Sequence, residues 1–234
     1  ALKREAQNEL VLPYSKVGRP ADAVKFLIEF ARAGDRYLAL AGRLATIYTE
    51  QNEFERSSEL LRILMVEAKK AAIDGKDQSY MVVQFQRQIV NNAVLRADKK
   101  ATVEEIGNLI RLYETELSRA PQEFQDEERD QTKRMILETA VAYQTEYNKT
   151  KDIRTLEYTQ RLYDEYLRVF RKDENAYQIS WNNALLMLTT EKYEQAAAEF
   201  EAVIAMNPDG EYADPAAERA VLAYLKVVQF KNQR

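Results

Sequence analysis

The stretch Trp181–Gly210 reads WNNALLMLTTEKYEQAAAEFEAVIAMNPDG, and it has the clearest structural pattern in the chain. It contains two segments with apolar residues at helical spacing, separated by a short polar turn and followed by a Pro-Asp-Gly stop. Small residues stand at Ala184 and Ala196, and Phe200 follows the second of them by one helical turn. This pattern predicts two antiparallel helices that pack closely against each other.

The same pattern recurs earlier in the chain. The interval from Ala45 to Ser57 is 57 − 45 = 12 residues, and the interval from Ala184 to Ala196 is 196 − 184 = 12 residues. Small residues in the first helix of successive pairs fall at Ala45, Ala93, Ala140 and Ala184, which are 48, 47 and 44 residues apart. A recurrence of this kind predicts stacked helical repeats, and a period above the usual 34 residues of a tetratricopeptide repeat implies longer helices or longer turns.

Ala184, Ala196, Phe200 and Pro208 also occupy the places where a tetratricopeptide repeat (TPR) has its small residues, its aromatic residue and its terminal proline. The stretch therefore resembles the TPR family. The resemblance implies an all-α superhelix, a TPR-like solenoid of about eleven antiparallel helices. The expected helical pairs cover about residues 2–34, 36–74, 77–120, 123–171 and 175–207, and a capping helix covers 213–231, in a single array over residues 1–234.

Two local signals refine these boundaries. Pro13 is expected to end the first helix, because proline lacks an amide hydrogen and clashes with the preceding turn. Thr102 is expected to cap the helix that follows it, with Glu105 three residues later completing a capping box. Only six glycines and five prolines occur among 234 residues, so regular structure must cover most of the chain.

The composition excludes several classes of activity. The net charge of −4 has the wrong sign for a nucleic-acid-binding surface. The chain has no cysteine and no histidine, which removes thiolate metal sites and the commonest general base. No apolar run approaches the length needed to cross a bilayer. No catalytic residue, cofactor or metal is predicted, and the chain is not expected to be an enzyme.

Adjacent carboxylates are the remaining candidates for catalysis, as at Glu104-Glu105 and Glu127-Glu128. Neighbouring residues on a helix point in different directions, so these pairs are predicted to be solvated. An enzyme that works with carboxylates alone would instead need them in a deep pocket with raised pKa values.

Aromatic residues have two interpretations. One pair of helices is rich in tyrosine, and these side chains either fill gaps between helices or form an interaction surface. They are Tyr143, Tyr147, Tyr158, Tyr163 and Tyr166. Packing is the preferred interpretation, with Tyr158 the most exposed. Trp181 is likewise expected in the core, and the alternative is an anchor in a binding groove.

Candidate binding residues lie on the first helix of each pair, which lines the concave face in solenoids of this type. Counting back two residues from the aligned alanines reaches Arg43, Asn91, Glu138 and Asn182, and one turn earlier lie Arg87, Arg134 and Gln178. All of these except the acidic Glu138 are candidate binding residues. The arginines could pair with a carboxylate of a partner peptide, and the amides could hydrogen-bond its backbone. The alternative is an ordinary solvated helix face without a specific ligand.

The tail MNPDGEYADPAAERAVLAYLKVV, together with the last repeat, resembles helical-repeat envelope proteins of predatory and gliding proteobacteria over about residues 176–228. That resemblance implies a periplasmic or outer-membrane-associated scaffold, linked to gliding motility, whose partners are other proteins of a complex. The alternative function is a cytoplasmic adaptor that binds the acidic tails of partner proteins.

Overall fold

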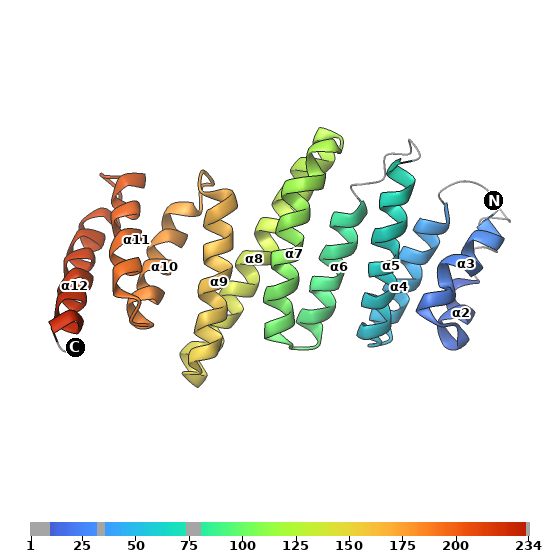
Figure 1. Ribbon diagram of the computed structural model, residues 1–234, viewed down its shortest axis with the longest axis horizontal. Coiled ribbons are helices and arrows are strands. Elements are labelled where there is room, and N and C mark those ends of the chain that lie inside the picture. Colours follow the sequence, from blue (N-terminus) through green and yellow to red (C-terminus); the bar gives the residue numbers. More distant parts are fainter. Residues whose placement is uncertain (1–9, 32–35, 74–80, 233–234) are drawn as a thin grey trace. The chain divides into compact units, whose positions relative to one another are not determined.

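The computed structural model describes residues 10–31, 36–73 and 81–232, and these residues are helical apart from short turns (Figure 1). Eleven α-helices and one 3-10 turn lie within the described ranges. They are α2 (Val11–Val17), α3 (Pro20–Ala31), α4 (Arg36–Glu50), α5 (Phe54–Ile73), α6 (Met81–Leu95), α7 (Lys99–Glu116), η1 (Leu117–Arg119), α8 (Gln122–Thr150), α9 (Ile153–Phe170), α10 (Ala176–Thr189), α11 (Tyr193–Met206) and α12 (Ala213–Asn232).

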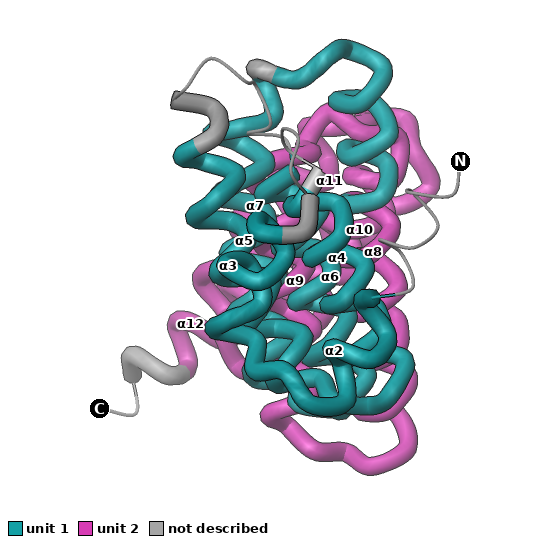
Figure 2. Tube along the Cα trace, turned by 90° about the vertical axis from the view of Figure 1, so that its right-hand side faces the viewer, with its two compact units in different colours: residues 1–132 teal, residues 133–234 magenta. Residues whose placement is uncertain are grey.

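The chain forms two compact units, residues 1–132 and residues 133–234, with the boundary inside α8 (Figure 2). In unit 1, α4 packs on α5, α5 on α6 and α6 on α7. In unit 2, α9 packs on α10, α10 on α11 and α11 on α12. Packing between helices that are neighbours in sequence is characteristic of an α-solenoid. The predicted all-α solenoid class is confirmed within each unit, whereas the single array over residues 1–234 stays a prediction.

The turns within the helical pairs repeat one backbone conformation. Asn52, Ala97, Lys151 and Glu191 have positive φ angles of 55° to 60°, and each lies between the two helices of a pair. In three of these turns the next residue donates its amide hydrogen to a carbonyl five residues earlier, as Lys192 does to Met187 at 2.9 Å. This left-handed residue reverses the chain tightly, although none of the four positions is glycine.

The aligned alanines explain how the helices approach each other. Ala45, Ala93, Ala140 and Ala184 are all buried, and so are Ala196 and Phe200. In unit 2, the side chains of Phe200 and Val203 on α11 form one apolar cluster with alanines of α10, α11 and α12. The residues that suggested the repeat are therefore the residues that pack the helices together.

Two boundary predictions are wrong. Helix α2 runs through Pro13, which lies in its first turn, where the missing amide has no acceptor to lose. The predicted helix upstream of Leu10 lies outside the described residues. Helix α7 begins at Lys99 rather than after Thr102, because the Asp98 carboxylate accepts a hydrogen bond from the amide of Ala101 at 3.0 Å and caps the helix.

Candidate functional site

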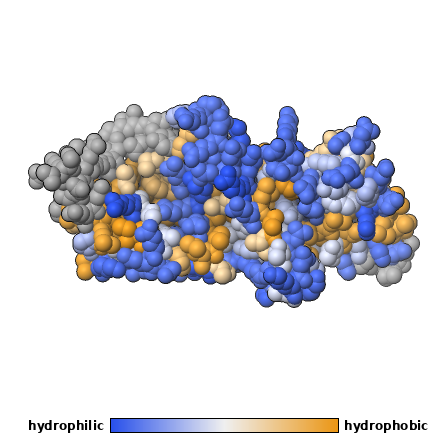
Figure 3. Space-filling view, turned by 180° about the vertical axis from the view of Figure 1, so that it is seen from behind, coloured by the Kyte–Doolittle hydropathy of each residue, from blue (hydrophilic) through white to orange (hydrophobic). Residues whose placement is uncertain are grey.

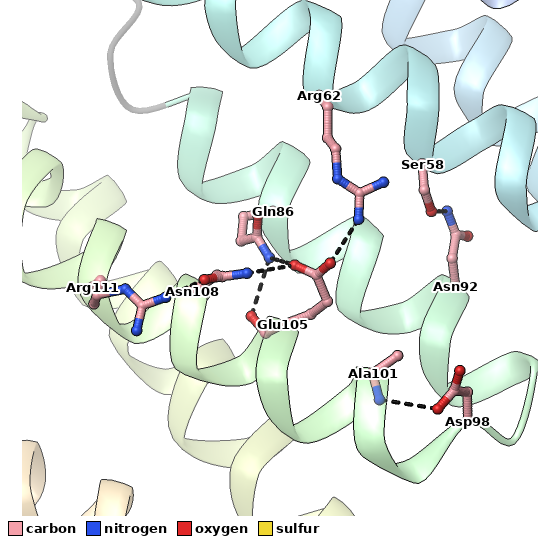
Figure 4. Close-up of polar contacts among 9 residues, drawn as sticks. All are labelled: Ser58, Arg62, Gln86, Asn92, Asp98, Ala101, Glu105, Asn108 and Arg111. Carbon is pink, nitrogen blue, oxygen red and sulfur yellow. Dashed lines mark hydrogen bonds and ion pairs between the residues drawn. The ribbon is translucent and has the colours of Figure 1, made fainter.

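A groove of about 420 Å³ lies over α5, α6 and α7 in unit 1. It contains apolar side chains, a carboxylate with its hydrogen-bond donors, and three cationic side chains. The lining residues are Arg62, Met65, Val66, Lys69, Gln86, Glu105, Asn108, Arg111 and Leu112. Figure 4 shows that Arg62 reaches from α5, Gln86 from α6 and Asn108 from α7 toward one point.

Glu105 is that point, and its carboxylate joins all three helices. Oε1 accepts a hydrogen bond from Arg62 at 2.6 Å. Oε2 accepts hydrogen bonds from Gln86 Nε2 at 2.7 Å and from Asn108 Nδ2 at 2.9 Å. Burial by itself raises the pKa of Glu105, but the hydrogen bonds from Asn108, Gln86 and Arg62 outweigh it and hold the pKa below its ordinary value. Glu105 is therefore ionised near neutral pH, and its hydrogen bonds hold the three helices together at the groove.

The rest of the groove combines an apolar surface with positive charge. Met65 and Leu112 are partly buried, and Val66 is 54% exposed. Lys69 and Arg111 are exposed, and the Arg62 side chain is 56% exposed even while it holds Glu105. An apolar area with a cationic border suits a segment that carries an aliphatic side chain beside a carboxylate.

The six candidate residues predicted from the sequence do not line this groove. In unit 1, Arg43 on α4 and Asn91 on α6 are exposed. Arg87 on α6 is partly buried and donates two hydrogen bonds to Glu128 on α8, from Nη2 at 2.9 Å and from Nε at 3.3 Å. The Glu128 carboxylate is 1% exposed, so Arg87 neutralises a buried charge.

In unit 2, Arg134 and Gln178 are exposed and Asn182 is half-buried. The buried amides are instead the next residues along, Asn92 and Asn183. Asn92 donates to Ser57 at 2.9 Å and to Ser58 at 3.0 Å, and Asn183 donates to Asp164 at 2.8 Å. Each buried asparagine directly precedes an aligned alanine, which places it on the side of its helix that faces the neighbouring helices.

The prediction that both adjacent carboxylate pairs are solvated is wrong for one member of each pair. Glu104 and Glu127 are exposed, whereas Glu105 is half-buried and Glu128 is buried. Adjacent helical residues point in different directions, as expected, but in each pair one direction leads into the protein. Both inward carboxylates hold structural hydrogen bonds, since Glu105 binds Arg62 and Glu128 binds Arg87.

The aromatic side chains pack against other side chains of the protein, in agreement with the preferred interpretation. Trp181 stacks on Tyr212 with ring centroids 5.3 Å apart and contacts Phe200 at 5.5 Å. Tyr163 is buried, which raises its pKa to about 12, and its hydroxyl donates to Gln144 at 2.9 Å. Tyr158 is half-buried with its ring 6.5 Å from that of Tyr143, so it is less exposed than expected.

The sequence does contain part of the groove's pattern. Glu105, Asn108 and Arg111 recur every three residues, which places them along one face of a helix. What sequence reasoning missed is that Arg62 and Gln86 come from two other helices to meet Glu105. Their approach depends on how α5, α6 and α7 pack.

Within residues 10–31, 36–73 and 81–232, no group of three or more acidic side chains is placed to hold a metal ion. None of the helices in the described ranges is both long enough and apolar enough to cross a membrane.

Comparisons with known proteins give no family assignment. No family model matches the chain, and no curated protein matches it. Among solved structures, it is similar to the TPR2AB domain of yeast Sti1 in a complex with pHSP90, at 14% identity and a TM-score of 0.33, covering 97% of this chain and 85% of that chain. It is also similar to the de novo designed helical repeat protein DHR64, at 16% identity and a TM-score of 0.33, with 97% of each chain covered. Similarities at this level do not identify a ligand.

Proposed function

We propose that this chain is a non-enzymatic scaffold that binds segments of other proteins. The observation that carries the proposal is the groove over α5–α7, where an apolar surface is bordered by Arg62, Lys69 and Arg111. The fold fixes the groove before any partner arrives, because Glu105 ties the three helices together. A preformed groove lowers the entropic cost of binding a flexible segment.

Binding would use two features of the groove together. An aliphatic side chain of the partner would rest on Met65, Val66 and Leu112. A neighbouring carboxylate would face Arg111, while Lys69, which pairs with Glu116 at 3.4 Å, would contribute less. Burial of an apolar side chain contributes about 1.5–3 kcal/mol, and an exposed ion pair adds at most about 1 kcal/mol. The apolar contact would therefore supply most of the affinity, and the charges would select acidic segments.

Absence of catalysis is supported by what the residues near the groove can do. The chain has no histidine or cysteine to serve as base or nucleophile. Glu105 has a lowered pKa and accepts three side-chain hydrogen bonds, so it is poorly suited to take up a proton. This chemistry favours holding a partner over transforming one.

A library of random short peptides displayed on phage tests the proposal. We expect the purified chain to enrich sequences that combine Asp or Glu with Leu, Ile, Val or Phe. Val66→Asp should remove the enrichment because it disrupts the apolar contact, and Arg111→Glu should remove it because it repels the carboxylate of the peptide. Arg43→Glu is the matched control, because Arg43 is also exposed in unit 1 but does not line the groove. Enrichment that survives both groove variants would overturn the proposal.

We further propose that the scaffold belongs to a multi-protein assembly of the bacterial cell envelope, with a link to gliding motility. The support is the resemblance of residues 176–228 to envelope proteins of predatory and gliding proteobacteria. Immunodetection of the native protein in osmotic-shock and membrane fractions tests this location. Recovery in the cytosolic fraction would favour the adaptor instead.

The alternative is a cytoplasmic adaptor that binds acidic tails through arginines of the first helices, either Arg43 and Arg87 in unit 1 or Arg134 in unit 2. The exposure of Arg43 and Arg134 favours it, while the bonding of Arg87 to Glu128 disfavours it. The two hypotheses differ in one measurement. Combined reversal of Arg43 and Arg134 to glutamate should abolish peptide enrichment for the adaptor and leave it intact for the groove.

A further inference from the structure

The groove over α5, α6 and α7 is crossed by two bridges, which are ion pairs that join α5 to α7. In one bridge, Arg62 Nη2 lies 2.6 Å from Glu105 Oε1, and Figure 4 shows it spanning the two helices. In the other, Lys69 Nζ lies 3.4 Å from Glu116 Oε1. The lining residues of α5 run from Arg62 to Lys69, and both of these side chains are about half exposed. The bridges therefore mark the two ends of the groove at its outer surface.

The distance between the bridges limits what the groove can hold. On α5 they are 69 − 62 = 7 residues apart, which is about 10 Å along the helix. On α7 they are 116 − 105 = 11 residues apart, which is about 16 Å. An extended chain advances about 3.3–3.6 Å per residue, so about three or four residues span this stretch. A longer segment laid along the groove would have to pass over the bridges, away from the apolar floor.

Apolar side chains and one cation line the stretch between the bridges. Met65 and Val66 line it from α5, and Leu112 lines it from α7. Arg111 differs from the cations of the bridges, because its guanidinium donates a hydrogen bond to the neutral amide oxygen of Asn108. A cation held by a neutral amide keeps its attraction for a carboxylate. An anionic group of a partner is therefore expected beside Arg111.

The other carboxylates of α5 and α7 do not lie between the bridges. They are Glu55, Glu59, Glu67, Glu104 and Glu114. Three of them form ion pairs outside the groove, namely Glu55–Arg96, Glu67–Lys70 and Glu104–Lys100. Glu59 precedes Arg62 on α5, so it lies beyond that bridge. Glu114 follows Leu112 by two residues, which places it about 200° around α7 from the groove.

Hydrophobic surface is also divided on the far side of the molecule. Figure 3 shows it there in patches separated by hydrophilic side chains. Among the described residues, a long apolar segment therefore finds no continuous track on that face either. This favours short motifs over long segments as partners.

We propose that the stretch between the bridges takes a short motif of a partner protein, about three or four residues long. This inference rests on the proposed function, since it specifies what the same groove accepts. One aliphatic side chain of the motif lies on Met65, Val66 and Leu112, and one carboxylate faces Arg111. Residues that flank the motif leave the surface at the bridges and contribute little affinity. Such a motif belongs in a loop or an unfolded segment, where the chain is free to approach and to leave.

Chemical-shift titration of the isotope-labelled full chain tests the length limit. The probes are acetylated and amidated peptides from the phage selection, namely a core of about four residues and the same core with progressively longer flanks. The dissociation constant of the longest peptide should lie within about threefold of that of the core, because the flanks bury little further surface. Affinity that rises more than about tenfold with length would overturn the short motif. If no peptide of any length binds, the proposed function itself fails.

Glu116→Ala removes the bridge to Lys69 and should create a dependence on length. The longest peptide should then bind about tenfold more tightly than the core, because it can continue along α5 and α7. Comparing the ratio of the two constants cancels any general gain from the released Lys69. Lys69→Ala removes the same bridge from the other helix and should give the same ratio.

Glu114→Ala is the matched control, because it removes an exposed carboxylate of α7 that does not line the groove. Its ratio should equal that of the natural chain. Ratios for Glu116→Ala and Lys69→Ala that match this control would show that the bridge does not end the site, and they would overturn the proposal.

Discussion

Arg87→Met is the substitution that most directly tests how unit 1 is held together. Arg87 on α6 donates to both carboxylate oxygens of Glu128 on α8, at 2.9 Å and 3.3 Å. The Glu128 side chain is 1% exposed and the Arg87 side chain is 27% exposed. Methionine keeps most of the aliphatic stem but leaves a buried carboxylate without its cation.

The expected cost follows from these exposures. Removing one partner of a fully buried ion pair costs about 3–5 kcal/mol, mainly because the remaining charge stays desolvated. Water reaches the arginine side of this pair, so we discount the loss to about 2–3 kcal/mol. With a urea dependence of about 2 kcal/mol/M, the unfolding midpoint should fall by about 1 M.

Urea unfolding followed by circular dichroism measures the change in helices of both units. Trp181, the only tryptophan, lies in unit 2, so its fluorescence follows that unit separately. Arg43→Met is the control, because Arg43 is exposed and its replacement should cost under about 0.5 kcal/mol. Replacing both partners, as in Arg87→Met with Glu128→Met, should recover more than half of the loss.

A midpoint for Arg87→Met that matches Arg43→Met would refute the reasoning. It would mean that the pair contributes nothing despite its burial. The result also affects how binding experiments are interpreted. If Arg87→Met destabilises unit 1, a charge reversal at Arg87 could abolish peptide binding by disturbing the fold, so such a loss would not show that Arg87 contacts the peptide.

Ala97→Gly should raise the free energy of unfolding by about 0.5–1 kcal/mol, because the φ of 55° at Ala97 is unfavourable for any residue with a Cβ atom. An increase in the urea midpoint would confirm this gain, and a decrease would contradict it. Asn92→Ala should lower the free energy of unfolding by about 2–3 kcal/mol, because it removes a buried amide that forms hydrogen bonds with Thr49, Ser57 and Ser58. An unchanged urea midpoint would show that these hydrogen bonds make no net contribution to stability. Burial by itself raises the pKa of Asp173, but hydrogen bonds from Lys133 and Tyr166 outweigh it, so the folded-state pKa lies well below the unfolded value of about 4. The stabilisation is therefore fully present above that pH and is lost as the pH falls, so Asp173→Asn should flatten the fall in urea midpoint between neutral and strongly acidic pH.

Local sequence patterns were sufficient to predict the helical architecture. Apolar residues at helical spacing and the scarcity of glycine and proline predicted helices, and the recurring alanines predicted how they pack. Ala45, Ala93, Ala140 and Ala184 are all buried, as expected for residues at helix contacts. These features could be predicted because they depend on residues close together along one helix.

Helix boundaries were less predictable where two signals competed. Asp98 and Thr102 both have side chains that can cap a helix, and the structure uses Asp98. Pro13 suits a helix start as well as a helix stop, and α2 places it in the first turn. Such choices depend on the packing of the whole segment rather than on one residue.

Which polar residues face inward depends on how the helices pack in three dimensions. A shift of one position on a helix rotates a side chain by about 100°, which is enough to exchange Asn91 for the buried Asn92. The same rotation separates the solvated Glu104 from Glu105, which forms the groove. The groove itself joins Arg62, Gln86 and Glu105 from three helices. Its residues are far apart in sequence, so its position follows from the packing of those helices and from no local pattern.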